Sequence, residues 1–296
     1  MQESILTSVF LPLALAFIML GMGLSLTLKD FKNILVYPKA MVLGLVNQLV
    51  LLPVFGFALV MLFELSGALA VGVMILAACP GGATSNLVSH LSRGDLALSI
   101  SLTAVSSFIT ILTIPLIVNF AILQFGEEGS VALPVLQTIM QIAGVTIIPV
   151  SIGMFLKKRF PILSLKADRP VRIASAVFFT LIILAAIIKE REHLVEYLLL
   201  TGPVALLLNV LTLVAGYLLA SILLLPRRQR LTIAIESGIQ NGTLGIMIAV
   251  TLLQNSEMAI PIAIYSLLMF VTSAFIILMV NLGRKKKMPA LGQIVP

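Results

Sequence analysis

The sequence predicts an all-α membrane protein, a polytopic helical bundle of nine transmembrane helices. The chain of 296 residues is 60% hydrophobic and only 10% charged, whereas soluble domains carry about 25% charged residues. Its apolar segments reach the length of about twenty residues that an α-helix needs to cross a bilayer. The strands of a transmembrane barrel are shorter and alternate in hydrophobicity, so these continuous apolar segments exclude a barrel.

Nine windows are long enough to cross a membrane. In chain order they are 5–28, 41–63, 69–91, 97–123, 133–156, 171–188, 197–225, 231–253 and 260–282. The first window has no basic segment before it and no cleavage site of small residues after it. We therefore expect a retained span and not a signal peptide.

The connections between the windows alternate in charge. Of the nineteen basic residues, only Lys189 and Arg191 fall on the side that collects most of the glutamates. Because positive loops stay in the cytoplasm, we expect a multi-pass membrane protein with its N-terminus outside and its C-terminus cytoplasmic. The net charge of +7 then reflects topology, and we expect no nucleic-acid partner.

Two of the predicted spans contain residues that interrupt a helix. The third contains Cys79-Pro80-Gly81-Gly82, in which proline lacks the amide donor and the glycines relax the backbone. The eighth contains Gly238 and Gly242 around Gln240-Asn241. If the halves have five helices each and the first lacks its opening helix, these spans occupy corresponding places. That pattern indicates a transporter's binding site between inverted repeats.

Glu236 lies inside the eighth span, where an ionisable side chain is by default a candidate functional residue. The alternative is a structural carboxylic acid that burial keeps protonated. Other polar residues at membrane depth could supply oxygen ligands to a hard cation such as Na⁺. They are Gln48, Ser85, Asn86, Gln240 and a stripe on one face of the fourth span, Ser99, Thr103, Ser106 and Thr110.

Each of these polar groups also has a structural interpretation. Hydroxyls in membrane helices often bond to their own backbone, and amides often link two helices. The sequence contains no HExxH, GxSxG or Walker-type motif, so we expect no enzyme and no cofactor apart from coupling ions.

Four groups of residues resemble the bile acid:sodium symporter family. They are Met22-Gly23-Leu24 with Asp30-Phe31, Cys79-Pro80-Gly81-Gly82 with Ser85-Asn86, Arg93 to Ser99, and Glu236-Ser237-Gly238-Ile239-Gln240-Asn241. The resemblance covers nearly the whole chain. It implies a core domain in which the two broken helices cross near the membrane centre, and a panel domain beside it. The panel would contain residues 1–38 and 131–195, the core 39–130 and 196–284, and the cytoplasmic tail 285–296.

The resemblance also implies two sodium sites. The first would use Ser85, Asn86, Ser99, Thr103 and Glu236. The second would use Gln48, Glu236 and Gln240 with the backbone oxygens of Ser237 and Ile239. The substrate would bind in the crevice between core and panel, next to Ala83 and Asn241. With nine predicted spans, the chain is expected to resemble the nine-helix members and not the ten-helix bacterial members, which have an additional N-terminal helix. It has alanine at position 83, where some bacterial relatives have threonine.

We therefore predict a sodium-coupled symporter that imports an organic anion by alternating access. A bile-acid-like, pantoate-like or keto acid would fit this description. The alternative is a proton-coupled carrier or an efflux permease of the same superfamily, for example for arsenite or a weak acid. A channel suits a buried carboxylate between two broken helices less well.

Overall fold

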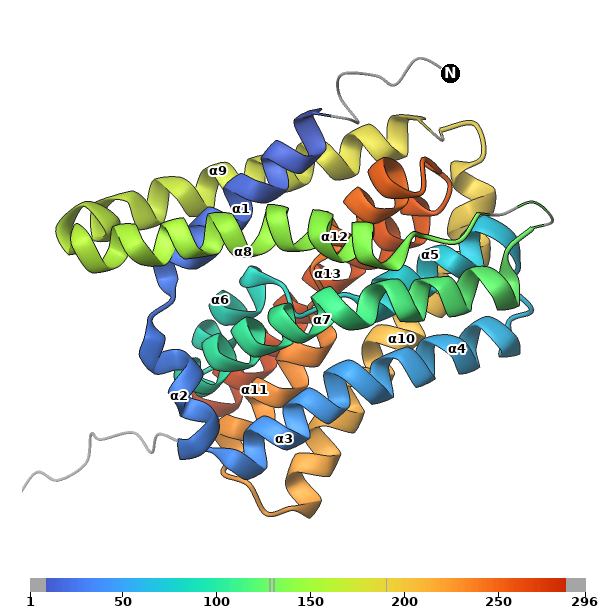
Figure 1. The fold of residues 1–296 in the computed structure, drawn as a ribbon. Helices are drawn as coiled ribbons and strands as arrows, with labels where there is room; N and C mark the ends of the chain where they lie inside the picture. The colour runs from blue at the N-terminus through green and yellow to red at the C-terminus, as the bar shows by residue number, and fades with distance from the viewer. Residues whose placement is uncertain (1–8, 128, 130, 190, 286–296) are drawn as a thin grey trace, which may run out of the picture.

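The computed structural model describes residues 9–127, 129, 131–189 and 191–285 (Figure 1). Within these ranges every regular element is a helix, and β-type pairing is limited to an isolated bridge. The elements are α1 (Leu11–Ser25), α2 (Leu28–Val36), α3 (Pro38–Val46), the π-helical segment η2 (Asn47–Leu51), α4 (Leu52–Leu62), α5 (Gly67–Ala78), α6 (Ala83–Leu91), α7 (Leu96–Phe125), α8 (Val135–Arg159), α9 (Pro161–Lys189), α10 (Leu194–Ile222), α11 (Arg227–Gly238), α12 (Gly242–Met247), the π-helical segment η3 (Ile248–Leu252) and α13 (Ala259–Lys285).

Several of these helices have the length and composition of membrane spans. Within the described ranges the long ones are Pro38–Leu62, Leu96–Phe125, Val135–Arg159, Leu194–Ile222 and Ala259–Leu282. The shorter apolar helices are Leu11–Ser25, Gly67–Ala78 and Gly242–Leu252. This confirms an all-α, multi-pass membrane bundle. The count of nine crossings stays a prediction, and the beginning of the first predicted window lies outside the described residues.

Two elements differ from the predicted windows. α2 is a separate helix in what we predicted as a connection, and it begins where the Thr27 amide and hydroxyl both donate to Asp30 Oδ2, at 2.6 and 2.7 Å. Hydrogen bonds to a carboxylate in the first turn help to fix the start of a helix. α9 begins at Pro161 instead of residue 171, because proline is favoured in the first turn and polar residues can extend a helix beyond its apolar part.

α1, α8 and α9 lie side by side along one face of the molecule and form the α1–α8–α9 layer (Figure 1). Glycines bring α1 and α8 together: a Cβ on Gly23 would lie 2.3 Å from the Val150 carbonyl oxygen, and one on Gly153 would lie 2.4 Å from that of Leu20. Small residues allow membrane helices to approach closely. α7, α12 and α13 contact this layer from the rest of the bundle.

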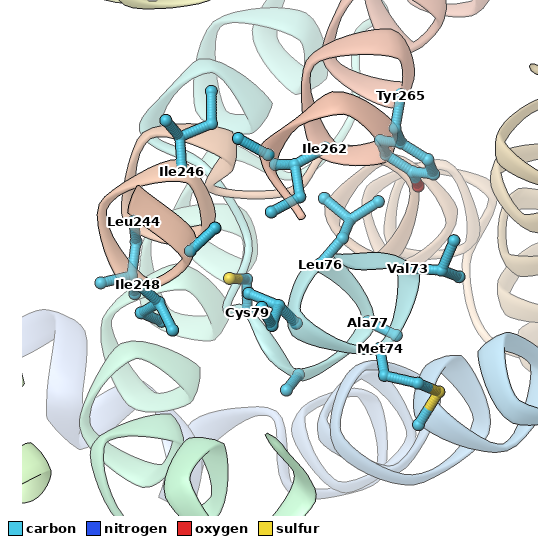
Figure 2. Close-up of a cluster of buried hydrophobic side chains, with 14 of the residues drawn as sticks. Val73, Met74, Leu76, Ala77, Cys79, Leu244, Ile246, Ile248, Ile262 and Tyr265 are labelled. Carbon is cyan, nitrogen blue, oxygen red and sulfur yellow. The ribbon is translucent and has the colours of Figure 1, made fainter. Parts of the chain in front are cut away.

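α5 runs through the interior of the bundle. All of its residues from Ala68 to Ala78 are buried, which suits a helix that is apolar on every side. In Figure 2, Val73 and Leu76 of α5 lie on the side facing Tyr265 of α13, while Cys79 lies on the side of α12. Because α5 is enclosed in this way, its C-terminal end places the first helix break inside the protein.

Candidate ion and substrate site

Both predicted helix breaks are present. α5 ends at Ala78, and α6 begins four residues after Cys79, at Ala83. Pro80 in this interval has no amide hydrogen with which to continue α5. α11 ends at Gly238 without a proline, and Ile239 is extended, with φ −114° and ψ 100°. There the following helix begins with its own cap, because Asn241 Oδ1 accepts from the Leu244 amide at 3.1 Å.

The two breaks pair with each other through their backbones. The Gly82 amide donates to the Ile239 carbonyl at 2.8 Å, and the Asn241 amide donates to the Pro80 carbonyl at 2.9 Å. These bonds flank an antiparallel bridge between Gly81 and Gln240. They satisfy backbone groups that the helix ends leave free, as a non-aqueous interior requires.

Only glycine fits at the centre of this pairing. A Cβ on Gly81 would lie 2.5 Å from Glu236 Oε1. A Cβ on Gly82 would lie 2.9 Å from the Gln240 carbonyl oxygen. The Pro-Gly-Gly sequence therefore ends one helix and lets the second break and the carboxylate of Glu236 approach it.

The carboxylate of Glu236, a residue only 2% exposed, is surrounded by hydroxyl groups. Its Oε2 accepts from Ser85 Oγ at 2.8 Å and from Ser99 Oγ at 2.9 Å, and its Oε1 accepts from Thr103 Oγ1. Ser99 Oγ also lies 2.9 Å from Asn86 Oδ1. The structure thus brings together all five side chains expected at the first sodium site, from α6, α7 and α11. We call these five residues the hydroxyl set.

Hydroxyl donors are the only hydrogen-bond partners of the Glu236 side chain among the described residues, and no Lys, Arg or His of these residues forms an ion pair with it. Hydrogen bonds stabilise a buried carboxylate but leave its charge uncompensated. The arrangement is therefore a buried acidic site rich in oxygen atoms, to which a small hard cation could bind.

Three of the residues expected at the second sodium site, Gln48, Gln240 and Ser237, are linked by hydrogen bonds, whereas the Ile239 carbonyl accepts from the Gly82 amide. Gln48 Nε2 donates to Gln240 Oε1 at 2.7 Å and to the Cys79 carbonyl at 3.0 Å. Gln240 Nε2 donates to the Ser237 carbonyl at 2.6 Å. We call Gln48, Gln240 and the backbone oxygens of Ser237 and Ile239 the amide set. The set links η2 to both breaks, whereas the bonds of the Glu236 side chain go to the hydroxyl set.

The other predicted positions separate into two kinds. Ala83 is the first residue of α6 and is partly exposed, and Asn241 is 7% exposed at the start of α12, so both flank the paired breaks. Ser106 Oγ and Thr110 Oγ1 instead donate to backbone carbonyls of their own helix, both at 3.2 Å. The stripe on α7 therefore divides, and its second half is structural.

Sequence reasoning missed two buried residues that contact the second break. Asn209 on α10 and Tyr265 on α13 both donate to the Gly238 carbonyl, at 2.7 and 3.1 Å. An amide within an apolar span was a visible signal for Asn209. Nothing local distinguishes Tyr265, because its role depends on how α13 packs.

Comparisons with known proteins show which transporters the chain resembles in sequence. Residues 12–197 match the Sodium Bile acid symporter family. The chain is 31% identical over 265 residues to an uncharacterized sodium-dependent transporter of Bacillus subtilis, covering 88% of this chain and 79% of that protein. It is 30% identical over 245 residues to the human ileal sodium/bile acid cotransporter, covering 81% and 69%.

A probable chloroplastic sodium/metabolite cotransporter of Arabidopsis thaliana is 31% identical over 252 residues, which cover 84% of this chain and 61% of the plant protein. The family match includes Gln48, Ser85 and Ser99 and ends before Glu236. The family and these relatives are transporters and not enzymes. The chain belongs to the sodium bile acid symporter family.

Proposed function

We propose that this protein is a sodium-coupled symporter that imports an organic anion by alternating access. The observation that carries the proposal is the buried Glu236 carboxylate, which three hydroxyls surround at the paired helix breaks and no described side-chain cation neutralises. The names of the relatives support sodium coupling in general.

The hydroxyl set forms the first sodium site in this proposal. A hydroxyl can donate to the carboxylate through its hydrogen and offer a lone pair to a cation. Ser99 Oγ lies within 2.9 Å of both Glu236 Oε2 and Asn86 Oδ1, so small rotations would turn several oxygens toward one ion. The charge of sodium would then compensate that of Glu236.

The amide set forms the second sodium site, with Glu236 shared between the two ions. Gln48 Oε1 is buried and has no hydrogen-bond partner, so an oxygen acceptor is available beside the breaks. Each sodium ion that moves inward would contribute about 2.3 kcal/mol per 100 mV of membrane potential. Two ions with one monovalent anion would make transport electrogenic.

The anion would bind where α6 begins, next to Ala83 and Asn241, because helix N-termini favour negative charge. The α1–α8–α9 layer would act as the panel and the other helices as the core. In the structure the gap lined by Met22 of α1, Ser107 of α7 and Val150 of α8 is too narrow for a water molecule. The lining of this gap includes neither Ala83 nor Asn241. In this proposal the core moves relative to the panel and opens the crevice to the anion, which is the step that would alternate access.

The proposed topology has nine spans, inverted repeats, an outer N-terminus and a cytoplasmic C-terminus in a bacterial inner membrane. The antiparallel pairing of the two breaks supports a relation by inversion. The charge alternation of the loops supports the orientation.

A thermal-shift screen of the purified protein against a library of organic anions, with and without sodium, tests this function. We expect the melting temperature to rise with sodium, and to rise further with the transported anion only when sodium is present. Uptake of that anion into proteoliposomes should then follow an imposed sodium gradient. Uptake that follows a pH gradient and ignores sodium would instead support the proton-coupled carrier.

A further inference from the structure

We propose that Asn209 and Tyr265 are positioning residues that set the sodium affinity of the amide set by fixing the end of α11. We call the two residues the carbonyl clamp. The inference rests on the proposed sodium coupling and adds residues that the predicted ion sites do not include. It concerns how the backbone oxygens at the second break are held in place.

The carbonyl clamp is a compact triangle of polar atoms. The Gly238 carbonyl oxygen lies 2.7 Å from Asn209 Nδ2 and 3.1 Å from Tyr265 Oη, and Asn209 Nδ2 lies 3.2 Å from Tyr265 Oη. Asn209 and Tyr265 are both 0% exposed. They come from α10 and α13, so two other helices hold the last carbonyl of α11.

Gly238 lies between the two residues whose backbone oxygens belong to the amide set. A peptide group is planar, and the plane that contains the Gly238 carbonyl also contains the Ile239 amide. That amide donates to the Ile235 carbonyl at 3.0 Å, so the plane is held from both sides. The orientation of this plane limits where the Ser237 carbonyl before it and the Ile239 carbonyl after it can point.

The surroundings leave this peptide group little freedom to move. A Cβ on Gly238 would lie 2.5 Å from Leu213 Cδ2, so α10 packs directly against the backbone. The ring of Tyr265 belongs to the buried apolar cluster and lies on the side of Val73 and Leu76 (Figure 2). Close packing around the ring therefore holds the tyrosine hydroxyl in a fixed position.

The amide of Asn209 is used only in part. Its Nδ2 donates to the Gly238 carbonyl and to Tyr265 Oη, while its Oδ1 is buried without a hydrogen-bond partner. An unpaired buried acceptor is destabilising, so an apolar side chain of similar size would suit packing better. The hydrogen bond that Nδ2 donates to the Gly238 carbonyl therefore explains why an amide is present at this position.

Tyr265→Phe tests the clamp because it removes one hydroxyl and keeps the ring. We expect the sodium concentration for half-maximal thermal stabilisation to rise about fivefold, as for loss of one buried hydrogen bond. The melting temperature without sodium should stay close to that of the wild type. In proteoliposomes the sodium dependence of uptake should shift equally, with an unchanged KM for the anion at saturating sodium.

Ser273→Ala is the matched control, since Ser273 is buried on α13 but its hydroxyl donates to the Met269 carbonyl of the same helix. Its sodium half-saturation should equal that of the wild type.

If Tyr265→Phe does not fold, Asn209→Leu removes the other donor at similar volume, with Thr201→Val on α10 as its control. Asn209→Leu should likewise raise the sodium half-saturation.

The outcomes separate this inference from the proposed function. Sodium half-saturation that is unchanged in a folded clamp variant, while the wild type responds to sodium, overturns the clamp alone. A clamp variant that loses melting temperature in the absence of sodium but keeps its sodium affinity shows a purely structural role and also overturns it. A wild-type protein whose stability and uptake ignore sodium overturns both.

Discussion

The hydroxyl set and the amide set lie at the same pair of helix breaks but are built differently. The hydroxyl set converges on one formal charge, since three hydroxyls donate to the carboxylate of Glu236. The amide set is neutral, and Gln48 and Gln240 link backbone carbonyls of both breaks. Sodium binding at the hydroxyl set should therefore depend on the charge of Glu236, and sodium binding at the amide set should depend on the geometry of the backbone.

The difference follows from the elements that supply the groups. Ser99 and Thr103 stand on the continuous helix α7, and Ser85 stands in the first turn of α6, just after the first break. Side chains within helices keep fixed directions. The carbonyls of Ser237 and Ile239 flank the end of α11, where helical hydrogen bonding stops. We therefore expect a cation at the hydroxyl set to replace hydrogen bonds between side chains, and a cation at the amide set to order the backbone at a break.

Glu236→Gln should have the largest effect, because it removes the only formal charge in either set. Breaking a buried charge interaction costs about 3–5 kcal/mol, so we expect sodium-dependent uptake to fall at least a hundredfold. The protein should still insert and purify, because glutamine fills nearly the same volume. Uptake assays in proteoliposomes and size-exclusion profiles check this. Wild-type sodium-driven uptake by this variant would refute the shared role of Glu236.

Gly81→Ala should come next, because its added Cβ would push the Glu236 carboxylate away from the paired breaks. The new Cβ would lie 2.5 Å from Glu236 Oε1, and overpacking of this kind costs about 1–3 kcal/mol. We expect a lower melting temperature and loss of most sodium-dependent uptake. Gly144→Ala is the control, since no atom lies within 4 Å of its added Cβ. Equal behaviour of the two variants would show that the pairing tolerates a side chain.

Ser99→Ala should weaken the hydroxyl set without dismantling it. The variant removes one donor to a carboxylate, and hydrogen bonds to charged groups contribute about 1.5–3 kcal/mol. We expect the sodium half-saturation of uptake to rise about tenfold or more. Thr110→Ala on the same helix should change it little, because Thr110 Oγ1 donates to the Ser107 carbonyl. Titration of uptake with sodium for both variants distinguishes a binding hydroxyl from a structural one.

The sequence predicted the hydroxyl set better than the surroundings of the amide set, for a physical reason. The helical period alone places Ser99 and Thr103 on one face of α7, and Pro80 marks a break wherever the helix packs. The start of α9 at Pro161 and the separate helix α2 depend on weaker signals at helix ends. The carbonyl clamp depends on how α10 and α13 pack against the end of α11, and no local sequence pattern predicts this packing.

Gln48→Leu should have the smallest effect on affinity and the most specific effect on coupling. Leucine keeps the volume of the side chain but cannot bond to Gln240 or to the Cys79 carbonyl, as Gln48 does at 2.7 and 3.0 Å. If only the amide set loses its ion, the Hill coefficient of sodium-activated uptake should fall from about two to about one. The sodium half-saturation of the remaining site should change by less than about threefold, because the bonds of Glu236 go to the hydroxyl set.

Asn47→Leu controls for loss of a neighbouring amide on η2. Asn47 Nδ2 donates to the Thr212 carbonyl of α10, at 3.2 Å, and not to either break. We therefore expect this variant to keep the wild-type Hill coefficient even if its melting temperature falls. A coefficient near two in Gln48→Leu would mean that the amide set joins the breaks without binding an ion. The second sodium ion would then have to bind elsewhere. The contrast between a charged ion site and a backbone ion site would no longer hold.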